Sequence, residues 1–363
     1  MYKRQQLHEG YTLPADWYSD PVIFALEQRL IFARSWQYAG PVEWLAQSGS
    51  YFTAHAGHVP VVIVRDDDTI RAFVNVCRHR AHLVAQGRGT RQSLQCPYHA
   101  WTYGLDGCLR SAPRAQHEAT FRFEDLSLIP IACETAGPFV FVNPDADAAP
   151  LTDTLGDVLD QVTQGGIDFS ALRLRSTQEW AAAGNWKNAI ENNLECYHCP
   201  VAHPSFSRAI DVSPEAYRLR VEGQVMSQTG PVRHGSGELP EGEIVEAQYH
   251  MVFPNTSIDV VPGPPNVEVY SWVPDGLAGM RGTVHYFYPE SVTDTEIAQL
   301  QRFNAEVGGE DVALIASVQV GLDSGMVRQG RLMAESEQLI SRFQRLVFEH
   351  LRPEIDDAGR PLR

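Results

Sequence analysis

The chain has 363 residues, enough for two domains of ordinary size or for one large domain with an insertion. Its 44% hydrophobic and 20% charged residues are typical of a soluble globular protein and exclude a disordered or fibrous one. Because 45 Asp and Glu outnumber 29 Lys and Arg, the net charge is −16, which disfavours nucleic acid or a membrane surface as a partner. No apolar stretch approaches the ~18 residues of a transmembrane helix and no secretory signal begins the sequence, so we expect a cytoplasmic protein.

In the first part of the sequence a helical pattern gives way to a strand pattern. Residues 21–36 carry apolar positions at helical spacing, which predicts a helix. From about residue 40 to residue 145, short β-branched segments bounded by turn residues predict strands at 59–64, 70–76 and 137–144. Residues 145–150, which are Ala, Asp and Pro, are a candidate crossing between two domains.

The second half of the sequence mixes helices and strands. The predicted helices are 154–163, 186–197, 293–320 and 333–351. The helix at 293–320 is expected to break at Gly308 and Gly309. Strands are predicted at 267–273 and 283–288. The expected architecture is a small all-β module followed by an α+β domain.

Two short segments, 77–79 and 96–99, each contain one cysteine and one histidine. The four potential metal ligands are Cys77, His79, Cys96 and His99. Zinc would bind all four in a tetrahedron, but zinc sites usually pair two cysteines in one segment with two histidines in another. A Rieske [2Fe-2S] cluster takes two cysteines on one iron and two histidines on the other, which suits one Cys and one His from each loop. The spacing favours a Rieske cluster shielded by Pro97 and Trp101, and such a cluster alone only carries electrons.

A second set of potential ligands lies near residue 200. His198 and His203 are five residues apart and would point about 140° apart on an ideal α-helix, so the helix must end or bulge between them, as Pro200 would cause. Glu195 is three residues before His198, so the two would share a helix face, and the carboxylate can accept a hydrogen bond from the imidazole. Two imidazoles and one carboxylate form the facial triad of non-haem Fe(II) oxygenases. The set predicts a mononuclear iron site whose third ligand comes from elsewhere.

Cys196 and Cys199 raise the alternative of a zinc site. They bracket His198 so closely that four-fold coordination would be strained. Six cysteines in 363 residues make no disulfide framework, so we expect these two to be small core residues.

The third iron ligand is sought on a buried helix face. Positions 311, 314, 315 and 318 lie on one stripe of the helix predicted over 293–320, and three of them are apolar, so the stripe is expected to face a core. An acid on such a stripe is unfavourable unless it is paired or bound to metal. Asp311 is therefore the predicted third ligand, and Glu310, on the flank, is the alternative.

Together the two ligand sets resemble those of the α subunits of Rieske non-haem iron ring-hydroxylating oxygenases. The resemblance covers nearly the whole sequence and includes Asn185-Trp-Lys187, Glu195-x-x-His198-x4-His203 and Glu310-Asp311. It implies an α+β protein with an N-terminal helical segment (1–38) that packs on the catalytic domain, a Rieske domain (39–148) and a helix-grip catalytic domain (149–363). The last would be an antiparallel sheet with long helices.

The resemblance also implies cofactors and partners. They are a [2Fe-2S] cluster, Fe(II), O2 as co-substrate, and a separate flavin or iron–sulfur reductase that brings electrons from NAD(P)H. The sequence itself has no Gly-x-Gly-x-x-Gly run after a strand, so the protein is not expected to bind NAD. The family forms homotrimers or α3β3 hexamers, in which His99 of one subunit would pass electrons to Glu195 of the next, and Glu195 would hold His198.

One segment resembles a particular branch of this family. Glu195-Cys-Tyr-His-Cys199 followed by His203-Pro204 is similar to the branch of glycine betaine and stachydrine demethylases and carnitine and choline monooxygenases, whereas most ring dioxygenases carry Asp at the Glu195 position. Ala100 stands where the family commonly has Gly, which we expect to be a minor change. The resemblance implies N-demethylation or C-hydroxylation of a quaternary ammonium compound such as a betaine.

Two other functions remain open at this point. Hydroxylation or O-demethylation of an aromatic acid would use the same iron chemistry. A non-catalytic Rieske electron-transfer protein would need no second ligand set, so His198, His203 and Asp311 argue against it.

A quaternary ammonium substrate would need aromatic faces around its charge. The candidates alternate along two predicted strands: Tyr270, Trp272, Tyr286 and Tyr288. The same alternation is also typical of core aromatics of a sheet. A carboxylate on the substrate would need an Arg or Lys that the sequence does not identify.

Overall fold

The computed structural model describes residues 7–356 and 359–362. The protein divides into two compact units. The smaller unit is Phe32–Leu151, and the larger unit consists of the described residues up to Ile31 and from Thr152 onward. Within the described ranges, no helix combines the length and the apolar character needed to cross a bilayer.

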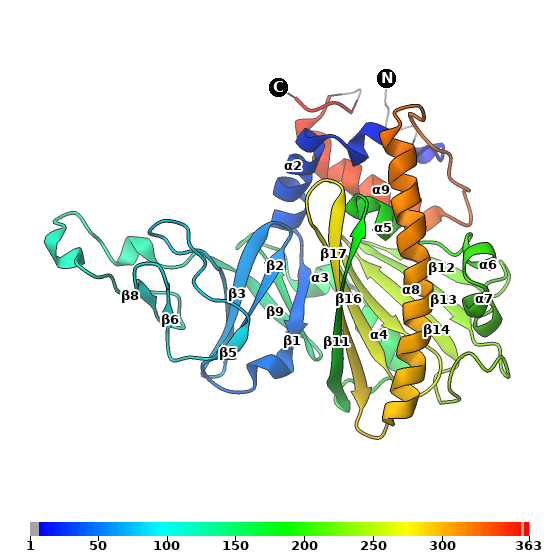
Figure 1. Ribbon diagram of the computed structural model, residues 1–363, viewed down its shortest axis with the longest axis horizontal. Coiled ribbons are helices and arrows are strands. Elements are labelled where there is room, and N and C mark those ends of the chain that lie inside the picture. Colours follow the sequence, from blue (N-terminus) through cyan, green and yellow to red (C-terminus); the bar gives the residue numbers. More distant parts are fainter. Residues whose placement is uncertain (1–6, 357–358, 363) are drawn as a thin grey trace. The chain divides into compact units, whose positions relative to one another are not determined.

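The smaller unit contains a seven-stranded sheet in the order β1-β10-β9-β4-β3-β2-β5 and a three-stranded sheet in the order β6-β7-β8, all antiparallel (Figure 1). Its strands are β1 Gln37–Pro41, β2 Ser50–Ala56, β3 Val59–Asp66, β4 Thr69–Val74, β5 Arg88–Thr90, β6 Leu94–Gln95, β7 Thr102–Tyr103, β8 Leu109–Ser111, β9 Pro130–Ala136 and β10 Phe139–Asn143. Its 3-10 helices are η2 Phe32–Arg34, η3 Val42–Leu45, η4 Ala115–His117 and η5 Glu124–Leu126.

Strand β3 of this unit contains an unbroken run of apolar residues, Val61–Val64. Val62 and Val64 pack in one hydrophobic cluster together with Cys77 and Cys96, whereas Val61 and Ile63 pack in a second cluster on the other face. Both faces of the strand are therefore buried, which favours β-branched residues at every position.

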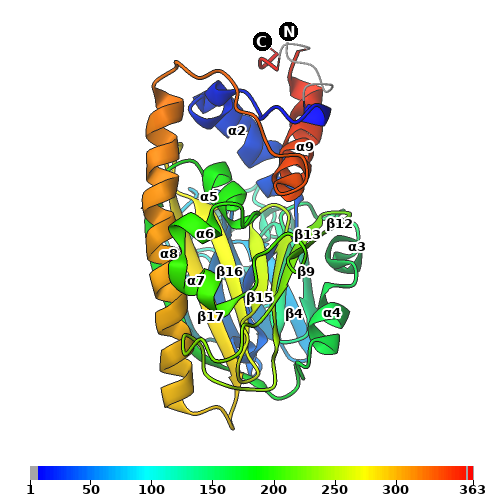
Figure 2. The same cartoon turned by 90° about the vertical axis from the view of Figure 1, so that its right-hand side faces the viewer.

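The larger unit is built on a seven-stranded antiparallel sheet in the order β11-β17-β16-β15-β14-β13-β12. Its strands are β11 Leu172–Ala183, β12 Arg218–Glu222, β13 Val225–Pro231, β14 Glu246–Val252, β15 Thr256–Val260, β16 Val267–Pro274 and β17 Gly279–Pro289. Its helices are η1 Ala15–Tyr18, α2 Pro21–Leu30, α3 Leu151–Leu155, α4 Val158–Gln164, α5 Trp186–Asn193, α6 Cys199–Ala202, α7 Pro204–Ala209, α8 Asp294–Asp323, α9 Gln338–Leu351 and η6 Arg352–Glu354. Figure 2 shows α8 running along one face of the sheet, with α5, α6 and α7 on the same side. This arrangement agrees with the predicted α+β class of antiparallel sheet and long helices.

Several predicted helices have different bounds in the structure. The helix predicted over 21–36 ends at Leu30, and the one predicted over 154–163 is divided at Gly156, which has a left-handed φ of 55°. The helix predicted over 333–351 begins only at Gln338. The expected break at Gly308 and Gly309 was wrong, because α8 is continuous there. A glycine lowers helix propensity by only about 1 kcal/mol, which the packing of α8 against β11, α5 and α7 offsets.

The N-terminal segment is tied to helix α5 by a buried ion pair. Lys187 Nζ lies 2.5 Å from Glu27 Oε1, and both side chains are fully buried. Trp186 donates its indole N–H to Glu27 Oε2 at 2.8 Å, and the Asn185 side chain caps the N-terminus of α5. The Asn185-Trp-Lys187 motif therefore anchors the start of the helix that leads into the second ligand set.

Candidate metal centres and substrate cavity

The two cysteine–histidine segments of the smaller unit form two loops with the same backbone hydrogen bonds. Cys77 N donates to His82 O and Cys96 N donates to Trp101 O, both at 2.8 Å. The backbone N–H groups of Ala81 and Ala100 donate hydrogen bonds to the carbonyls of Cys77 and Cys96. The two alanines have φ values of 56° and 59°. Ala100 thus adopts a left-handed conformation that favours glycine, so the methyl group expected to be a minor change adds local strain.

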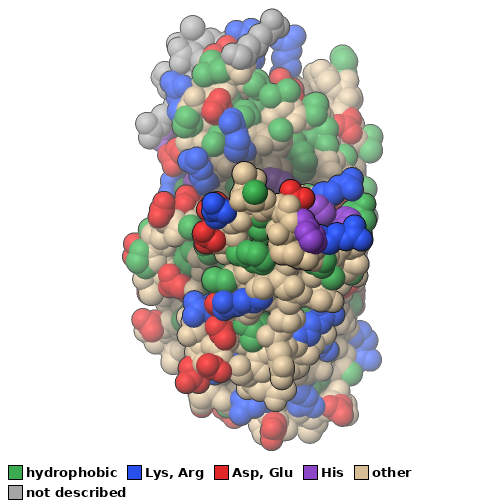
Figure 3. Space-filling view, turned by 90° about the vertical axis from the view of Figure 1, so that its left-hand side faces the viewer, with side chains coloured by type: hydrophobic (Ala, Val, Ile, Leu, Met, Phe, Trp, Pro, Cys, Tyr) green, Lys and Arg blue, Asp and Glu red, His purple; other side chains and the backbone are tan. Residues whose placement is uncertain are grey.

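The loops bring the four predicted cluster ligands to one place. Cys77 and Cys96 are buried in the same cluster, whereas His79 is exposed and His99 half-buried. The two Nδ1 atoms of the histidines are 3.2 Å apart. Donors at right angles on one ion, with bonds of about 2.1 Å, would be about 3 Å apart, so this imidazole pair fits one iron and the buried thiols fit the other. Figure 3 shows one face of the molecule, on which histidine side chains lie next to Lys or Arg side chains.

Tyr103 is a cluster neighbour that the sequence reasoning missed. Its hydroxyl lies 3.3 Å from Cys77 Sγ and accepts a hydrogen bond from the backbone N–H of Arg78 at 3.0 Å. It is fully buried, and its position on the short strand β7 gave no signal in the sequence. Hydrogen bonds at a cluster sulfur tune the reduction potential of such clusters.

The second ligand set lies where helix α5 gives way to two short helices. His198 precedes α6, which Pro200 helps to begin, and His203 stands between α6 and α7 with φ −123° and ψ 74°. The predicted helix ends before both histidines, at Asn193, and not between them, and Pro200 helps to begin the short helix α6 that separates them. The break lets both rings point to one place, with their Nε2 atoms 3.0 Å apart.

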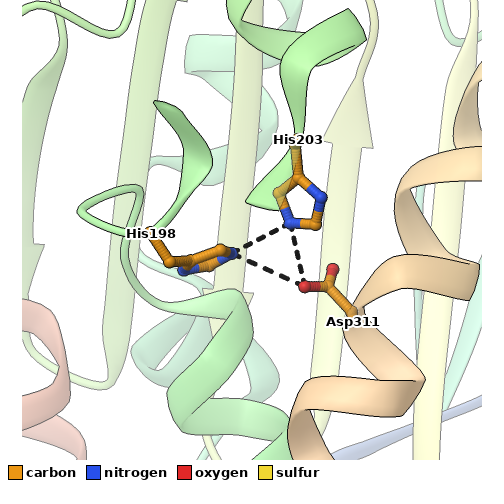
Figure 4. A group of neighbouring side chains, drawn as sticks. All are labelled: His198, His203 and Asp311. Atoms are coloured by element: carbon orange, nitrogen blue, oxygen red, sulfur yellow. Dashed lines mark hydrogen bonds and ion pairs between the residues drawn. The ribbon is translucent and has the colours of Figure 1, made fainter. Parts of the chain in front are cut away.

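Asp311 reaches the same place from helix α8 (Figure 4). Its Oδ1 lies 3.0 Å from His203 Nε2 and 3.5 Å from His198 Nε2. The three donor atoms lie within 4.8 Å of one another and face a common point. Two imidazole nitrogens and a carboxylate oxygen at separations near 3 Å fit one octahedral ion such as Fe(II).

Asp311 lies at this place, but the helix stripe that was expected to bury it is largely exposed. The stripe containing positions 311, 314, 315 and 318 does not face a core, because Leu314 is 37% and Val318 51% exposed. Only Ile315 is buried on it. In this part of α8 the buried residues are Ile315 and Gln319, and Gln319 accepts hydrogen bonds from the Asn185 backbone N–H and the Asn188 amide.

A carboxylate and an amide contact His198 and Asp311, two of the residues that surround the candidate metal position. Glu195 contacts His198 Nδ1 and also accepts from the backbone N–H of His198 at 3.1 Å. The two residues meet in a turn after α5 ends at Asn193, so the expected shared helix face was wrong. Asn192 donates an amide N–H to Asp311 Oδ1 at 3.0 Å.

The electrostatics of the set follow from these contacts. Burial would lower the pKa of His198, but the hydrogen bonds that the ring donates to Asp311 and Glu195 outweigh burial and raise that pKa to about 9. Burial would raise the pKa of Asp311, but its bonds to His198 and His203 hold it below the ordinary value. A cation placed between the donor atoms would therefore meet an ionised carboxylate and take the place of protons on the rings.

Cys196 and Cys199 form a disulfide, with their Cα atoms 4.9 Å apart. The prediction that they are separate small core residues was therefore wrong. Their bond closes the loop around His198, and neither sulfur is left as a ligand.

A cavity of about 320 Å³ adjoins the second ligand set. Asn192 and Asp311 line both this cavity and the smaller one at the histidines. Three of the four predicted aromatics, Tyr270, Trp272 and Tyr286, line it. Tyr288 does not: it is fully buried farther along β17, where it packs in a cluster with Leu300 and Ile297 of α8.

The sequence reasoning missed Trp180, which also lines the cavity. Trp180 pairs across strands with Gly282, where a Cβ would lie only 2.0 Å from the indole Cε2. The alternation of Gln178 and Trp180 along β11, both in the lining, was the available signal.

The protein matches two known domain families and has relatives along nearly its whole length. Residues 169–352 match the ring hydroxylating alpha subunit (catalytic domain), and residues 35–124 match the Rieske [2Fe-2S] domain. The carnitine monooxygenase oxygenase subunit of Escherichia coli K12 is 33% identical over 90% of this chain and 89% of its own length. The chloroplastic choline monooxygenase of Atriplex hortensis is 31% identical over 92% of this chain and 77% of its own.

A solved structure extends the likeness to three dimensions. It is that of a quaternary ammonium Rieske monooxygenase, described as revealing insights into carnitine oxidation by gut microbiota and inter-subunit electron transfer. It has a TM-score of 0.84 at 30% identity and covers 94% of this chain and 95% of that one. These matches confirm the predicted family, enzyme class and cofactors. The chain belongs to the ring-hydroxylating oxygenase α subunits, O2-dependent enzymes with a Rieske [2Fe-2S] cluster and a non-haem iron, and is similar to the carnitine and choline monooxygenases.

Proposed function

We propose that this protein is the oxygenase component that hydroxylates a small quaternary ammonium compound, such as a betaine, by oxidative N-demethylation or C-hydroxylation. One observation carries the proposal. The cavity beside the candidate iron ligands is lined by four large aromatic rings and the Asp311 carboxylate, and none of its described lining residues is Lys, Arg or His. Such a wall attracts a quaternary ammonium group, whereas an aromatic acid offers it no positive charge.

We assign the metal ligands as the donor geometry suggests. His198, His203 and Asp311 would hold Fe(II), and the cluster ligands would be Cys77, His79, Cys96 and His99. When bound, the two groups supply O2 activation and single electrons. In the net reaction, O2, two electrons and two protons convert a C–H bond, on an N-methyl group or on the carbon skeleton of the substrate, into C–OH plus water. An N-hydroxymethyl product then loses formaldehyde and a proton to leave the tertiary amine.

The protein's own residues orient the donors. Glu195 and Glu310 each contact the Nδ1 of one histidine, so that both Nε2 atoms are aimed inward and can give up their protons to a metal ion. Asn192 fixes Oδ1 of Asp311. The aromatic rings exclude water and hold a cationic head group beside Asp311, and the amides of Gln178, Asn192 and Asn304 can bond to oxygens of the substrate.

We propose further that the enzyme is a homotrimer served by a separate flavin or iron–sulfur reductase. Glu195 would be the bridge that carries electrons from His99 of the partner subunit to His198. The proposal is supported by the name of the E. coli relative, an oxygenase subunit, and by the inter-subunit electron transfer described for the similar structure.

A single-turnover experiment tests the reaction without the native reductase. Dithionite-reduced enzyme is mixed with O2 and choline, glycine betaine, L-carnitine, benzoate or vanillate, and formaldehyde, aldehydes, phenols and residual substrate are quantified. We expect oxidation of a quaternary ammonium compound only. Product from an aromatic acid alone would support the alternative function and overturn the proposal.

Mixed trimers test the electron path. Cys96→Ser should lack the cluster and Asp311→Ala should lack the mononuclear iron, so each should be inactive alone. Refolding or co-expressing the two together should restore part of the activity if electrons cross between subunits. An inactive mixture that light scattering shows to be trimeric and mixed would contradict the inter-subunit path.

A further inference from the structure

Two buried carboxyl groups lie side by side in the sheet of the larger unit, outside the candidate iron site. Asp259 of β15 and Glu268 of β16 are direct cross-strand partners, and they are only 4% and 1% exposed. No Lys, Arg or His among the described residues forms an ion pair with either of them. Because a buried carboxylate without a positive partner is unfavourable, ionising either of these groups has an energetic cost.

The two carboxyls accept hydrogen bonds from uncharged donors and have no positively charged partner. Glu268 Oε2 accepts from the Tyr270 hydroxyl at 2.9 Å, and its Oε1 accepts from the Asn304 amide. Ser257 donates to Asp259. Burial raises the pKa of Glu268 to about 8, with a further contribution from Asp259, and burial raises the pKa of Asp259 to about 7.

Besides Asp259 from β15, the groups that face Glu268 are uncharged. They are Tyr270 from its own strand, Tyr249 from β14, Tyr286 and Tyr288 from β17, and Asn304 from α8. The tyrosines stay neutral because burial raises the pKa of each hydroxyl. Among these described groups, the only negative charges are therefore those that the two carboxyls themselves acquire.

Glu268 is connected to the substrate cavity through its two hydrogen-bond donors. Tyr270 and Asn304 both line the cavity, whereas Glu268 lies behind them. Residues 268, 270 and 272 share one face of β16, and the rings of Tyr270 and Trp272 are stacked with centroids 5.4 Å apart. A phenol that donates to a carboxylate becomes richer in electrons, which strengthens its attraction for a cation over the ring.

We infer that Glu268, with Asp259 beside it, is a positioning residue that makes the cavity prefer a positively charged substrate over a neutral molecule of the same shape, acting through Tyr270 and Asn304. The inference rests on the proposed function and deepens it. A quaternary ammonium group in the cavity supplies the positive charge that the pair lacks, and Glu268 releases its proton to solvent as the cation binds.

Choline and 3,3-dimethylbutan-1-ol test this inference because they have the same shape and differ in charge. Their dissociation constants are measured by calorimetry with the metal-loaded, anaerobic enzyme at pH 6.5 and pH 8.5. In the wild type, choline should bind more tightly at the higher pH, because the cation favours ionised Glu268. The neutral alcohol should show no such change.

Glu268→Gln keeps the shape of the side chain and removes its charge. It should weaken choline binding at pH 8.5 by about tenfold, leave the alcohol unchanged and reduce the pH dependence to the part that Asp259 contributes. Glu268→Asp should restore part of the preference. Glu179→Gln is the matched control: Glu179 is exposed on β11 between two cavity residues and faces the other side of the sheet, so choline binding should not change.

The outcomes separate the inference from the proposed function. Equal losses for choline and the alcohol would mean that Glu268 only packs, and an unchanged choline affinity would mean that its charge does nothing; either result overturns the inference. A wild type that binds choline no better than the alcohol also overturns it, and the single-turnover assay then decides separately whether a quaternary ammonium compound is oxidised. If Glu268→Gln fails to fold, Asp259→Asn and Tyr270→Phe should each reduce the choline preference and not the alcohol affinity, and no reduction in either overturns the inference.

Discussion

Glu310 Oε2 lies 2.7 Å from Nδ1 of His203, and Asp311 Oδ1, from the next residue of α8, lies 3.0 Å from Nε2 of the same ring. Consecutive carboxylates of one helix therefore hold the two nitrogens of one imidazole. Only the Asp311 oxygen also approaches His198, at 3.5 Å from its Nε2. The contacts assign different roles to the two acids that the sequence offered as the third ligand.

Removing each acid should have a different effect on iron. Asp311→Ala should lose mononuclear iron and keep the visible spectrum of the cluster. Glu310→Gln should retain iron but weaken its binding by about 10–100-fold, because the imidazole loses the partner that orients it. Iron content during chelator titration, followed with the cluster spectrum, measures both. Loss of iron only in the Glu310 variant would reverse the assignment.

Glu195→Gln should keep both metals and substrate binding but turn over at less than about a tenth of the wild-type rate. The amide can still bond to His198 but cannot keep the same proton on Nδ1. Steady-state oxygen uptake with reductase, compared with metal content, tests this. A variant that retains more than about half the activity would rule out the bridge, and one that loses mononuclear iron would make Glu195 a ligand.

Ala100→Gly should stabilise the smaller unit by up to about 1 kcal/mol. The left-handed φ of 59° strains alanine by about 1–2 kcal/mol, and the greater freedom of glycine in the unfolded state offsets part of the gain. Thermal loss of the cluster absorption measures it. Ala46→Gly is the control: Ala46 has an ordinary φ of −65° in the same unit, so the same substitution should not stabilise there. A lower melting temperature for Ala100→Gly would contradict the strain.

Gly282→Ala should raise the KM for a quaternary ammonium substrate and keep both metals. The new methyl would overlap the Trp180 ring, at 2.0 Å from Cε2, so the ring must move within the cavity wall. Gly321→Ala on α8 is the control, since a Cβ there meets nothing within 4 Å. Unchanged kinetics in the Gly282 variant would show that the position of Trp180 does not matter to the substrate.

Glu268→Gln should make the protein more stable than the wild type at alkaline pH. The folded-state pKa of Glu268, about 8, lies above its ordinary value of 4.5, so its contribution to stability is fully present below pH 4.5 and is lost as the pH rises through 8. The glutamine does not titrate, so the difference should reach roughly 2–4 kcal/mol by pH 9 and be small at pH 5. Urea unfolding at both pH values measures it, with Glu179→Gln expected to show no such change. A difference independent of pH would mean that Glu268 is ionised at no energetic disadvantage.

The sequence by itself determined the donor chemistry. One thiolate and one imidazole in each of two short segments, and two imidazoles five positions apart in the sequence, are ligand types that bind iron in any fold. They predicted the two metal sites, and the family followed from a resemblance in these motifs. The α+β class was predicted from the patterns of helices and strands. Local patterns also predicted the cores of strands such as β3, because burial on both faces demands a run of β-branched residues.

Only the tertiary structure decided which distant groups meet. Helical periodicity put Asp311 on a stripe expected to be buried, but the docking of α8 on the sheet left Leu314 and Val318 exposed. The turn after Asn193, not a helix face, joins Glu195 to His198. Trp180 over Gly282 and Asp259 beside Glu268 depend on strand register, which is fixed by packing between segments far apart in the sequence. Such pairings leave no periodic trace in either segment alone, so the cavity and its buried carboxyls could be recognised only once the sheet was assembled.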